Sequence, residues 1–237
     1  MRLDKYLAEM RVGTRQEVKK QIRQGKVTVN GTVVKAADTK IDETCDEVTI
    51  GGRNISYVSY EYYMLNKPGG VVSATEDRRD TTVIDLIKDK KRKDLFPVGR
   101  LDKDTEGLLL ITNDGDLAHR LLAPKKHVDK VYYAKIDGMV TEEDVKRFAE
   151  GIDIGAEEEE MTRPAKLDIM KSAEESEIRL TIHEGKFHQV KRMLAARGKP
   201  VLYLKRVRMG NLPLDPALEP GTYRHLTEDE VESLRNF

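Results

Sequence analysis

The stretch that decides the fold is Pro97-Val98-Gly99-Arg100-Leu101-Asp102-Lys103-Asp104-Thr105-Glu106-Gly107-Leu108-Leu109-Leu110, in which charged residues directly precede an apolar run. Residues 108–112 predict a buried strand, which the turn-forming sequence Asn113-Asp114-Gly115 ends. Such a density of charge at the entrance to a buried strand is typical of a functional loop. On these residues alone, a solvated turn in which Asp102 caps the backbone is the alternative interpretation.

Predicted strands and helices lie on both sides of this loop without a βαβ repeat. The sequence Asn66-Lys67-Pro68-Gly69-Gly70 has the composition of a turn. This mixture predicts an α+β fold class with a mixed, mostly antiparallel β-sheet. Strands are predicted at residues 57–65, 71–73, 108–112, 131–136, 166–170 and 178–182, and helices at residues 82–90, 141–150 and 189–197, with a short helix through Leu117 and Leu121.

The first 50 residues have a different pattern, which predicts two helices followed by a hairpin. Apolar residues recur at helical spacing in residues 3–10, and the capping-box sequence of residues 14–17 begins a second helix that Gly25 ends. Asn30-Gly31 between two β-branched runs predicts the hairpin. The second helix places three cations at i, i+4 and i+8, along one exposed stripe: Arg15, Lys19 and Arg23.

Basic and acidic residues are equal in number, 42 each, but are unevenly distributed. Residues 1–35 carry nine Lys or Arg against three acids, and residues 183–210 carry eight against one. Residues 141–160 compensate with nine acids against two bases. Two basic regions suit a polyanionic partner, because phosphate contacts need Lys and Arg gathered on one side. Two solvated helix faces are the alternative.

Composition limits the class of protein. The chain of 237 residues has room for two domains, and its 38% apolar and 35% charged residues exclude general disorder. Because Gly51-Gly52-Arg53-Asn54 has the composition of a linker, we expect a domain at residues 1–52, a linker at 53–60 and a second domain at 61–237. No apolar stretch is long enough to span a bilayer or to form a signal peptide, so we expect a cytoplasmic protein.

The spacing of potential metal ligands argues against a metal site. Cys45 is the only cysteine, which excludes an internal disulfide and a cysteine-pair zinc site. The five histidines show no spacing such as His-x-x-x-His, and neither a Gly-x-Gly-x-x-Gly sequence nor a Walker loop occurs. We therefore expect no metal and no nucleotide cofactor.

Three motifs in the first 50 residues resemble the S4 RNA-binding domain. They are Arg2-Leu3-Asp4-Lys5, Thr14-Arg15 and Gly25-Lys26-Val27-Thr28-Val29-Asn30-Gly31. The resemblance implies that the face formed by the two helices binds structured RNA, and the basic stripe falls on that face. A small adaptor domain that binds protein is the alternative.

The loop quoted first resembles the catalytic loop of one group of rRNA pseudouridine synthases, which comprises synthase A for the small ribosomal subunit, together with synthases B, E and F for the large one. The signature of that group is Gly-Arg-Leu-Asp followed by Thr-x-Gly-Leu. Asn66-Lys67-Pro68, Lys130-Val131-Tyr132 and residues 184–193 resemble further motifs of the family. Together with the S4 unit, the resemblance implies a pseudouridine synthase type of catalytic domain and covers essentially the whole chain.

The resemblance is closest to the branch that acts on the small subunit. The sequences typical of that branch are residues 188–193, 161–165, 221–224 and 226–228. Large-subunit relatives usually have arginine at the positions of His188 and Lys191. It implies a cofactor-independent isomerase that acts on one uridine of 16S rRNA, of the uridine-516 class, either in rRNA or in an assembly intermediate of the small subunit. We expect a monomer with no membrane partner. A 23S rRNA substrate and a non-catalytic S4-domain ribosome-assembly factor are the alternatives.

The resemblance also implies roles for individual residues. Asp102 is the catalytic carboxylate, which attacks the sugar or the base or removes a sugar proton, and Lys191 is its basic partner. Tyr132 supplies a ring on which the extruded uracil stacks, and its phenol can help remove the C5 proton. Arg100 occupies the gap that the flipped base leaves. Without the resemblance, a strand-core tyrosine and a solvated lysine would be the simpler interpretations.

A second acidic residue in the loop raises one further alternative. Asp102 and Asp104 suggest a two-carboxylate glycosidase, but we expect the two side chains to point to opposite sides of the loop, which suits that mechanism poorly. The basic clusters and the family motifs together predict RNA contacts for these side chains: Arg2, Arg15, Lys19, Arg23, Lys26, Lys67, Arg100, Lys186, His188, Gln189 and Arg192.

Overall fold

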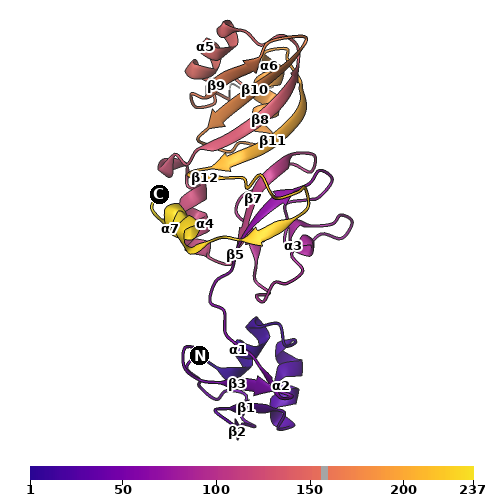
Figure 1. Ribbon diagram of the computed structural model, residues 1–237, viewed down its shortest axis with the longest axis vertical. Helices are drawn as coiled ribbons and strands as arrows, with labels where there is room; N and C mark the ends of the chain where they lie inside the picture. The colour runs from indigo at the N-terminus through magenta and orange to yellow at the C-terminus, as the bar shows by residue number, and fades with distance from the viewer. Residues whose placement is uncertain (156–159) are drawn as a thin grey trace. The chain divides into compact units, whose positions relative to one another are not determined.

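The computed structural model describes residues 1–155 and 160–237, so the acidic run 157–160 lies largely outside the described residues. The chain divides into two compact units (Figure 1). One contains Met1–Glu61 and Lys88–Leu95, and the other contains Tyr62–Ile87 and Phe96–Phe237. Within the described residues, no helix is long and apolar enough to cross a membrane.

The first unit is the predicted pair of helices with a small sheet. The helices α1 (Leu3–Glu9) and α2 (Arg15–Arg23) pack through apolar residues on one core, and the capping box at Thr14 is formed. Asn30 and Gly31 both have positive φ, as a tight hairpin turn requires. The sheet has the order β2-β1-β3-β4, formed by β1 (Val27–Val29), β2 (Thr32–Val33), β3 (Val48–Ile50) and β4 (Arg53–Asn54).

Residues 53–60, expected as a linker, instead belong to this unit. Gly51 and Gly52 form the turn between β3 and β4, and the Ile55 amide continues the pairing by donating to the Val48 carbonyl. The sequence showed only two glycines beside polar residues, a composition that a hairpin turn and a linker share.

Residues 88–95 join the first unit through buried polar contacts that the sequence did not indicate. The Arg92 guanidinium is buried and contacts Glu9 at 3.1 Å, Asp94 at 2.7 Å and the Tyr57 hydroxyl at 3.1 Å. The buried Glu61 carboxylate accepts the Arg92 backbone amide at 2.7 Å. Arg92 contacts Glu61 although about thirty residues separate the two in the chain, so local sequence patterns give no sign of this contact.

The second unit is built on one mixed sheet, as predicted. All neighbouring strands are antiparallel except β7 and β11, which are parallel. The strand order is β13-β5-β7-β11-β8-β10-β9, with β6 on β7 and β12 on β11. The strands are β5 (Tyr62–Lys67), β6 (Phe96–Pro97), β7 (Glu106–Thr112), β8 (Lys130–Asp137), β9 (Lys166–Lys171), β10 (Glu175–Ile182), β11 (Val201–Met209), β12 (Leu212–Pro213) and β13 (Tyr223–His225).

The helices of the second unit lie near different parts of this sheet. Figure 1 shows α4 and α7 beside β5 and β7, and α5 and α6 near β9 and β10. Apolar residues of α4, α7, β5 and β7 share one buried core with Met209 and Leu212. The helices are α3 (Val83–Leu86), α4 (Gly115–Leu122), α5 (Glu142–Glu150), α6 (Gln189–Ala196) and α7 (Glu228–Arg235), with a short 3₁₀ helix, η1, at Pro124–Lys126.

Several predicted boundaries were wrong. The strand expected at 57–65 begins at Tyr62 and runs to Lys67, so Asn66 and Lys67 are strand residues rather than turn residues. The helix expected at 82–90 is the single turn α3, because Ile87 is already extended. Residues 71–73 contribute only an isolated bridge at Val72. The longest strand, β11, was not predicted, because its basic residues interrupt the apolar pattern.

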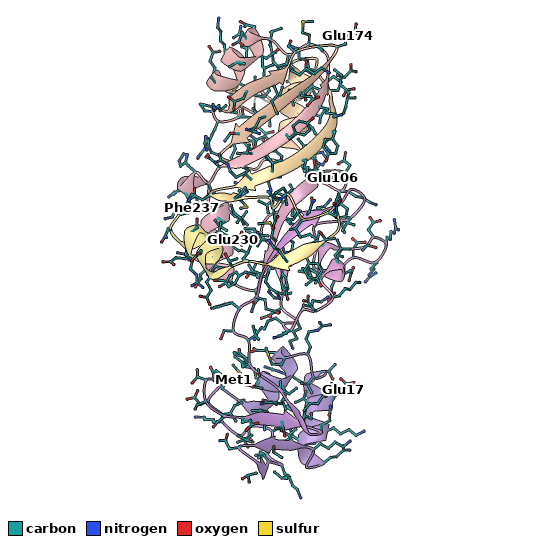
Figure 2. The ribbon with its side chains drawn as sticks, in the orientation of Figure 1. Met1, Glu17, Glu106, Glu174, Glu230 and Phe237 are labelled. Atoms are coloured by element: carbon teal, nitrogen blue, oxygen red, sulfur yellow. The ribbon has the colours of Figure 1, made fainter. Side chains whose placement is uncertain are left out.

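Gly107 is required where β7 meets β11. Its φ is +98°, and a Cβ atom there would lie 2.2 Å from the Arg206 carbonyl oxygen. Gly107 pairs with Lys67 of β5 on one side and with Arg206 of β11 on the other. The close approach of the backbones therefore fixes the position of the charged loop, which ends where β7 begins at Glu106 (labelled in Figure 2).

Candidate active site

A cavity of about 620 Å³ opens in the second unit next to the charged loop. Its lining comes from five parts of the chain: residues 72–74, the loop 99–103, Leu122 of α4, residues 184–188 and the sheet. The sheet contributes Lys130 and Tyr132 of β8 and Arg206 of β11. Asp102 therefore faces a space large enough for a nucleoside-sized group.

Hydrogen bonds from two side chains fix the backbone of the charged loop. The Ser73 hydroxyl donates to the Leu101 carbonyl at 2.8 Å and accepts from the Leu101 amide at 3.1 Å. Beneath the loop, the Lys67 ammonium donates to the carbonyl oxygens of Pro68 at 3.0 Å, Lys103 at 3.1 Å and Thr105 at 2.8 Å. The loop that carries Asp102 is thus held by side chains from β5 and from the segment after it.

Lys67 was predicted to contact RNA, and the structure contradicts this. The side chain is fully buried, so it cannot reach an RNA ligand. Burial lowers the pKa of the Lys67 ammonium to about 8. The sequence could not reveal this, because a lysine beside proline and glycines has the composition of an exposed turn.

Lys191 of α6 joins two carboxylates of the loop. Its Nζ lies 3.2 Å from Asp102 Oδ2 and 2.6 Å from Asp104 Oδ1. The hydrogen bond from Lys191 lowers the pKa of the Asp104 carboxyl. Burial acts to lower the pKa of Lys191, but its bonds to Asp104 and Asp102 outweigh burial and raise it. The predicted pairing of Asp102 with Lys191 is present as a contact.

The expectation that Asp102 and Asp104 point to opposite sides was wrong. Residues two apart share a side even in an extended segment, and here both carboxylates contact the Lys191 ammonium. The Thr105 amide donates to the Asp102 carbonyl at 3.1 Å and closes a turn between them. The two side chains nevertheless differ in environment. The Asp104 side chain is 75% exposed, whereas that of Asp102 is 25% exposed and lines the cavity.

Tyr132 lies on the floor of the same cavity. It is buried in β8, opposite Arg206 on β11 and Leu180 on β10. The three residues expected to be catalytic therefore meet: Asp102 and Tyr132 line the cavity, and Lys191 contacts Asp102.

The segment before α6 forms another wall. The Phe187 side chain is 74% exposed and stacks on the His188 imidazole, with 3.8 Å between ring centroids. His188 Nε2 lies 3.5 Å from Asp102 Oδ1. Arg100 also lines the cavity and is exposed. Exposed aromatic and basic groups thus surround the mouth of the cavity.

Gln189 is a second predicted RNA contact that the structure contradicts. Its side chain is buried, accepts the Lys186 amide at 2.9 Å and donates to Glu184 at 2.9 Å, so it shapes this wall instead. Two other residues that were predicted to bind RNA form ion pairs with Glu160 instead. The Lys186 ammonium lies 3.3 Å and the Arg192 guanidinium 2.6 Å from its carboxylate.

The remaining predicted RNA-binding residues lie in the first unit. Arg15, Arg23 and Lys26 are exposed. Arg2 donates two hydrogen bonds of 3.0 Å to Asp4, and Lys19 lies 3.9 Å from the same carboxylate. Of the five predicted contacts in this unit, two are therefore paired with Asp4. The other three form no ion pair with a carboxylate among the described residues.

Sequence reasoning missed two site residues, Lys130 and Arg206. Both line the cavity although both are buried. Strand register places both residues on the face of the sheet that carries Tyr132. This could not be seen from the sequence, because β11 was not predicted and the pairing of Arg206 with Tyr132 was therefore unknown. Among the described residues, no group of three or more His, Cys, Asp or Glu side chains could hold a metal ion.

Comparison with known proteins agrees with this geometry. Residues 61–196 match the family model described as RNA pseudouridylate synthase, and residues 1–48 match the S4 domain. The chain belongs to the RNA pseudouridylate synthase family. It is therefore an isomerase with an N-terminal S4 domain, as the motifs implied.

The similarity to individual family members spans the full chain. A protein of Bacillus subtilis (strain 168), named as an uncharacterized RNA pseudouridine synthase, is 49% identical over 99% of this chain and 98% of its own length. The ribosomal small subunit pseudouridine synthase A of Vibrio vulnificus is 43% identical over 99% of both chains. A crystal structure of a pseudouridylate synthase is 40% identical, with a TM-score of 0.69 over 99% of both chains.

Proposed function

We propose that this pseudouridine synthase isomerises one specific uridine of small-subunit 16S rRNA, with Asp102 as the catalytic carboxylate. The observation that carries the proposal is that Asp102 and Tyr132 line one cavity and that Lys191 contacts Asp102. The full-length similarity to a protein named ribosomal small subunit pseudouridine synthase A supports the choice of rRNA.

The reaction breaks the bond from C1′ to N1, turns the uracil in place and joins C1′ to C5. An ionised Asp102 acts as nucleophile or as base, and the Lys191 ammonium at 3.2 Å stabilises the carboxylate. Tyr132 offers its ring to the extruded base, and Arg100 at the mouth occupies the space that the base leaves. The exposed Phe187 suits stacking with a neighbouring base.

The first unit supplies affinity in this proposal. Arg15, Arg23 and Lys26 are exposed cations on or beside α2, which suits phosphate contacts. Because such contacts release counterions, we expect affinity for rRNA to fall steeply with salt. Removal of these charges weakens binding and leaves the chemistry at the cavity in place.

The decisive experiment compares Asp102→Asn with Asp104→Asn. Both carboxylates contact Lys191, but only Asp102 lines the cavity, so Asp104→Asn is a matched control for loss of one charge. Pseudouridine is mapped chemically in 16S and 23S rRNA, as transcripts and as assembly intermediates. We expect one modified uridine in 16S rRNA with wild type and Asp104→Asn, none with Asp102→Asn, and RNA binding retained by both.

Each other outcome overturns a defined part of the proposal. Turnover by Asp102→Asn refutes the assignment of the carboxylate. A modified uridine in 23S rRNA keeps the reaction and refutes the substrate. Tight binding without modification of any substrate favours a ribosome-assembly factor.

A further inference from the structure

Two buried cations on the cavity floor have no acidic partner among the described residues. Lys130 is 7% exposed and Arg206 is 2% exposed. Within the described parts of the chain, the Lys130 ammonium donates only to the Val128 carbonyl, at 3.3 Å. The Arg206 guanidinium donates through Nε to the Leu108 carbonyl at 2.8 Å, while its Nη2 is buried without a partner in the described structure. Both side chains have donor capacity to spare.

Strand register places these cations on the face that carries Tyr132. Arg206 of β11 pairs directly with Tyr132 of β8, and Lys130 precedes Tyr132 by two residues. Because side chains alternate between the faces of a sheet, Lys130 and Tyr132 share a face. All three residues line the cavity that Asp102 faces.

The surroundings do not neutralise this positive charge. The two acids whose charges act on Lys130 are engaged elsewhere: Asp129 contacts His183 at 2.8 Å and Arg208 at 3.5 Å, and Glu184 accepts from the Gln189 side-chain amide. Burial, followed by repulsion from Arg206, lowers the pKa of Lys130 to about 8. Apolar side chains would stabilise the fold better than unpaired buried cations. Charge kept at a cavity wall at such a cost indicates a ligand rather than a structural role.

The depth of the pair indicates which part of the substrate it meets. Arg100 and Lys103 at the mouth are exposed, which suits phosphates that stay close to water. Lys130 and Arg206 are buried beside Tyr132, so the group that reaches them is the one that enters deepest. In a base-flipping enzyme that group is the base.

We propose that Lys130 and Arg206 bind the carbonyl oxygens of the target uracil and stabilise the negative charge that the base acquires during the reaction. This inference rests on the proposed function. When the bond from C1′ to N1 breaks, its electron pair stays on the base and is shared with O2 and O4. When C1′ joins C5, an electron pair of the base forms the new bond, the proton on C5 leaves and N1 gains a proton. Two preorganised cations lower the energy of the charged intermediate stage.

The test replaces each floor cation by an apolar residue of similar length. Lys130→Met and Arg206→Met are compared with Lys186→Met, which removes a cation from the wall of the same cavity. Each protein is measured on an rRNA fragment with the target uridine and on the same fragment with an abasic target, which keeps every phosphate and lacks the base. The readouts are the single-turnover rate constant and the two dissociation constants.

We expect each floor variant to reduce the single-turnover rate constant by about 100-fold, as for removal of one oxyanion donor. Affinity for the abasic fragment stays unchanged within about twofold, because no phosphate contact is lost. Lys186→Met instead weakens both fragments equally. Wild-type rate constants in both floor variants would overturn the inference, and so would an equal loss of affinity for both fragments, which would indicate a phosphate site.

Two further measurements separate this inference from other failures. Thermal unfolding reports whether the variants fold, and if Arg206→Met does not, Lys130→Met decides alone, since its removal leaves no buried charge unpaired at that position. If wild type modifies no rRNA, the proposed function fails. The binding arms still decide this inference then, because wild type should prefer the uridine fragment and the floor variants should lose that preference.

Discussion

Lys67 and Lys130 are both buried lysines of the second unit, and they have opposite surroundings. Burial lowers the pKa of each to about 8. The Lys67 ammonium donates to three carbonyl oxygens at 2.8 to 3.1 Å, whereas the Lys130 ammonium donates to one at 3.3 Å and lines a cavity. Two buried lysines therefore have different roles. A buried lysine surrounded by acceptors fixes backbone, and one that keeps free donors beside a cavity is prepared for a ligand.

Gly107 lies between Lys67 and Arg206, the second buried cation of the cavity floor. Its replacement should have the largest effect on stability. It pairs with Lys67 on one side and Arg206 on the other. In Gly107→Ala the Cβ atom would lie 2.2 Å from a carbonyl oxygen at φ +98°, so we expect a loss of about 4 kcal/mol in the free energy of unfolding. Urea denaturation measures this. Gly115→Ala, where a Cβ meets nothing within 4 Å, is the control and should stay near wild type.

Lys67→Met should be the next most damaging change. It leaves the Pro68 and Thr105 carbonyls without the ammonium, while the Lys103 carbonyl keeps the Gly70 amide at 2.8 Å. We expect a loss of about 2 kcal/mol in stability, because buried acceptors become unsatisfied. Turnover should fall too, since the same loop carries Asp102. An unchanged stability would show that Lys67, like Lys130, does not brace the fold.

The sequence indicated which residues line the candidate site better than it indicated how the site is built. The Gly-Arg-Leu-Asp loop and the α6 motif pointed to Asp102 and Lys191, which are in contact in the structure, because such motifs are contiguous in the chain. The role of Lys67 depends on carbonyls up to 38 residues away in the chain. The place of Arg206 depends on β11, a strand that was not predicted because basic residues interrupt its apolar pattern. The α1–α2–hairpin pattern was predictable because capping boxes and Asn-Gly turns act locally. The position of residues 88–95 could not be predicted, because Arg92 contacts residues such as Glu9 that are far away in the chain.

Lys130→Met should change stability in the opposite direction from Lys67→Met. The variant removes a buried charge and leaves one weakly held acceptor, the Val128 carbonyl. Replacement of a buried ionic group by an apolar one is often stabilising, so we expect a gain of about 1 kcal/mol near neutral pH. Urea denaturation of the same preparations used for the rate measurements gives this value. A clear loss of stability would mean that Lys130 braces the fold and would remove the contrast with Lys67.

The difference in stability between Lys130→Met and wild type should then narrow as the pH rises. The Lys130 ammonium has a lower pKa in the folded protein, about 8, than in the unfolded chain, so between these values the unfolded state binds more protons. Wild type therefore gains stability above about pH 8, and from about pH 7 to about pH 8.5 we expect roughly 0.8 kcal/mol of narrowing. Lys67 titrates in the same range in both proteins, so subtracting the two curves isolates Lys130. A difference that stays constant with pH would mean that Lys130 is not desolvated, and the cavity floor would then be as well solvated as its mouth.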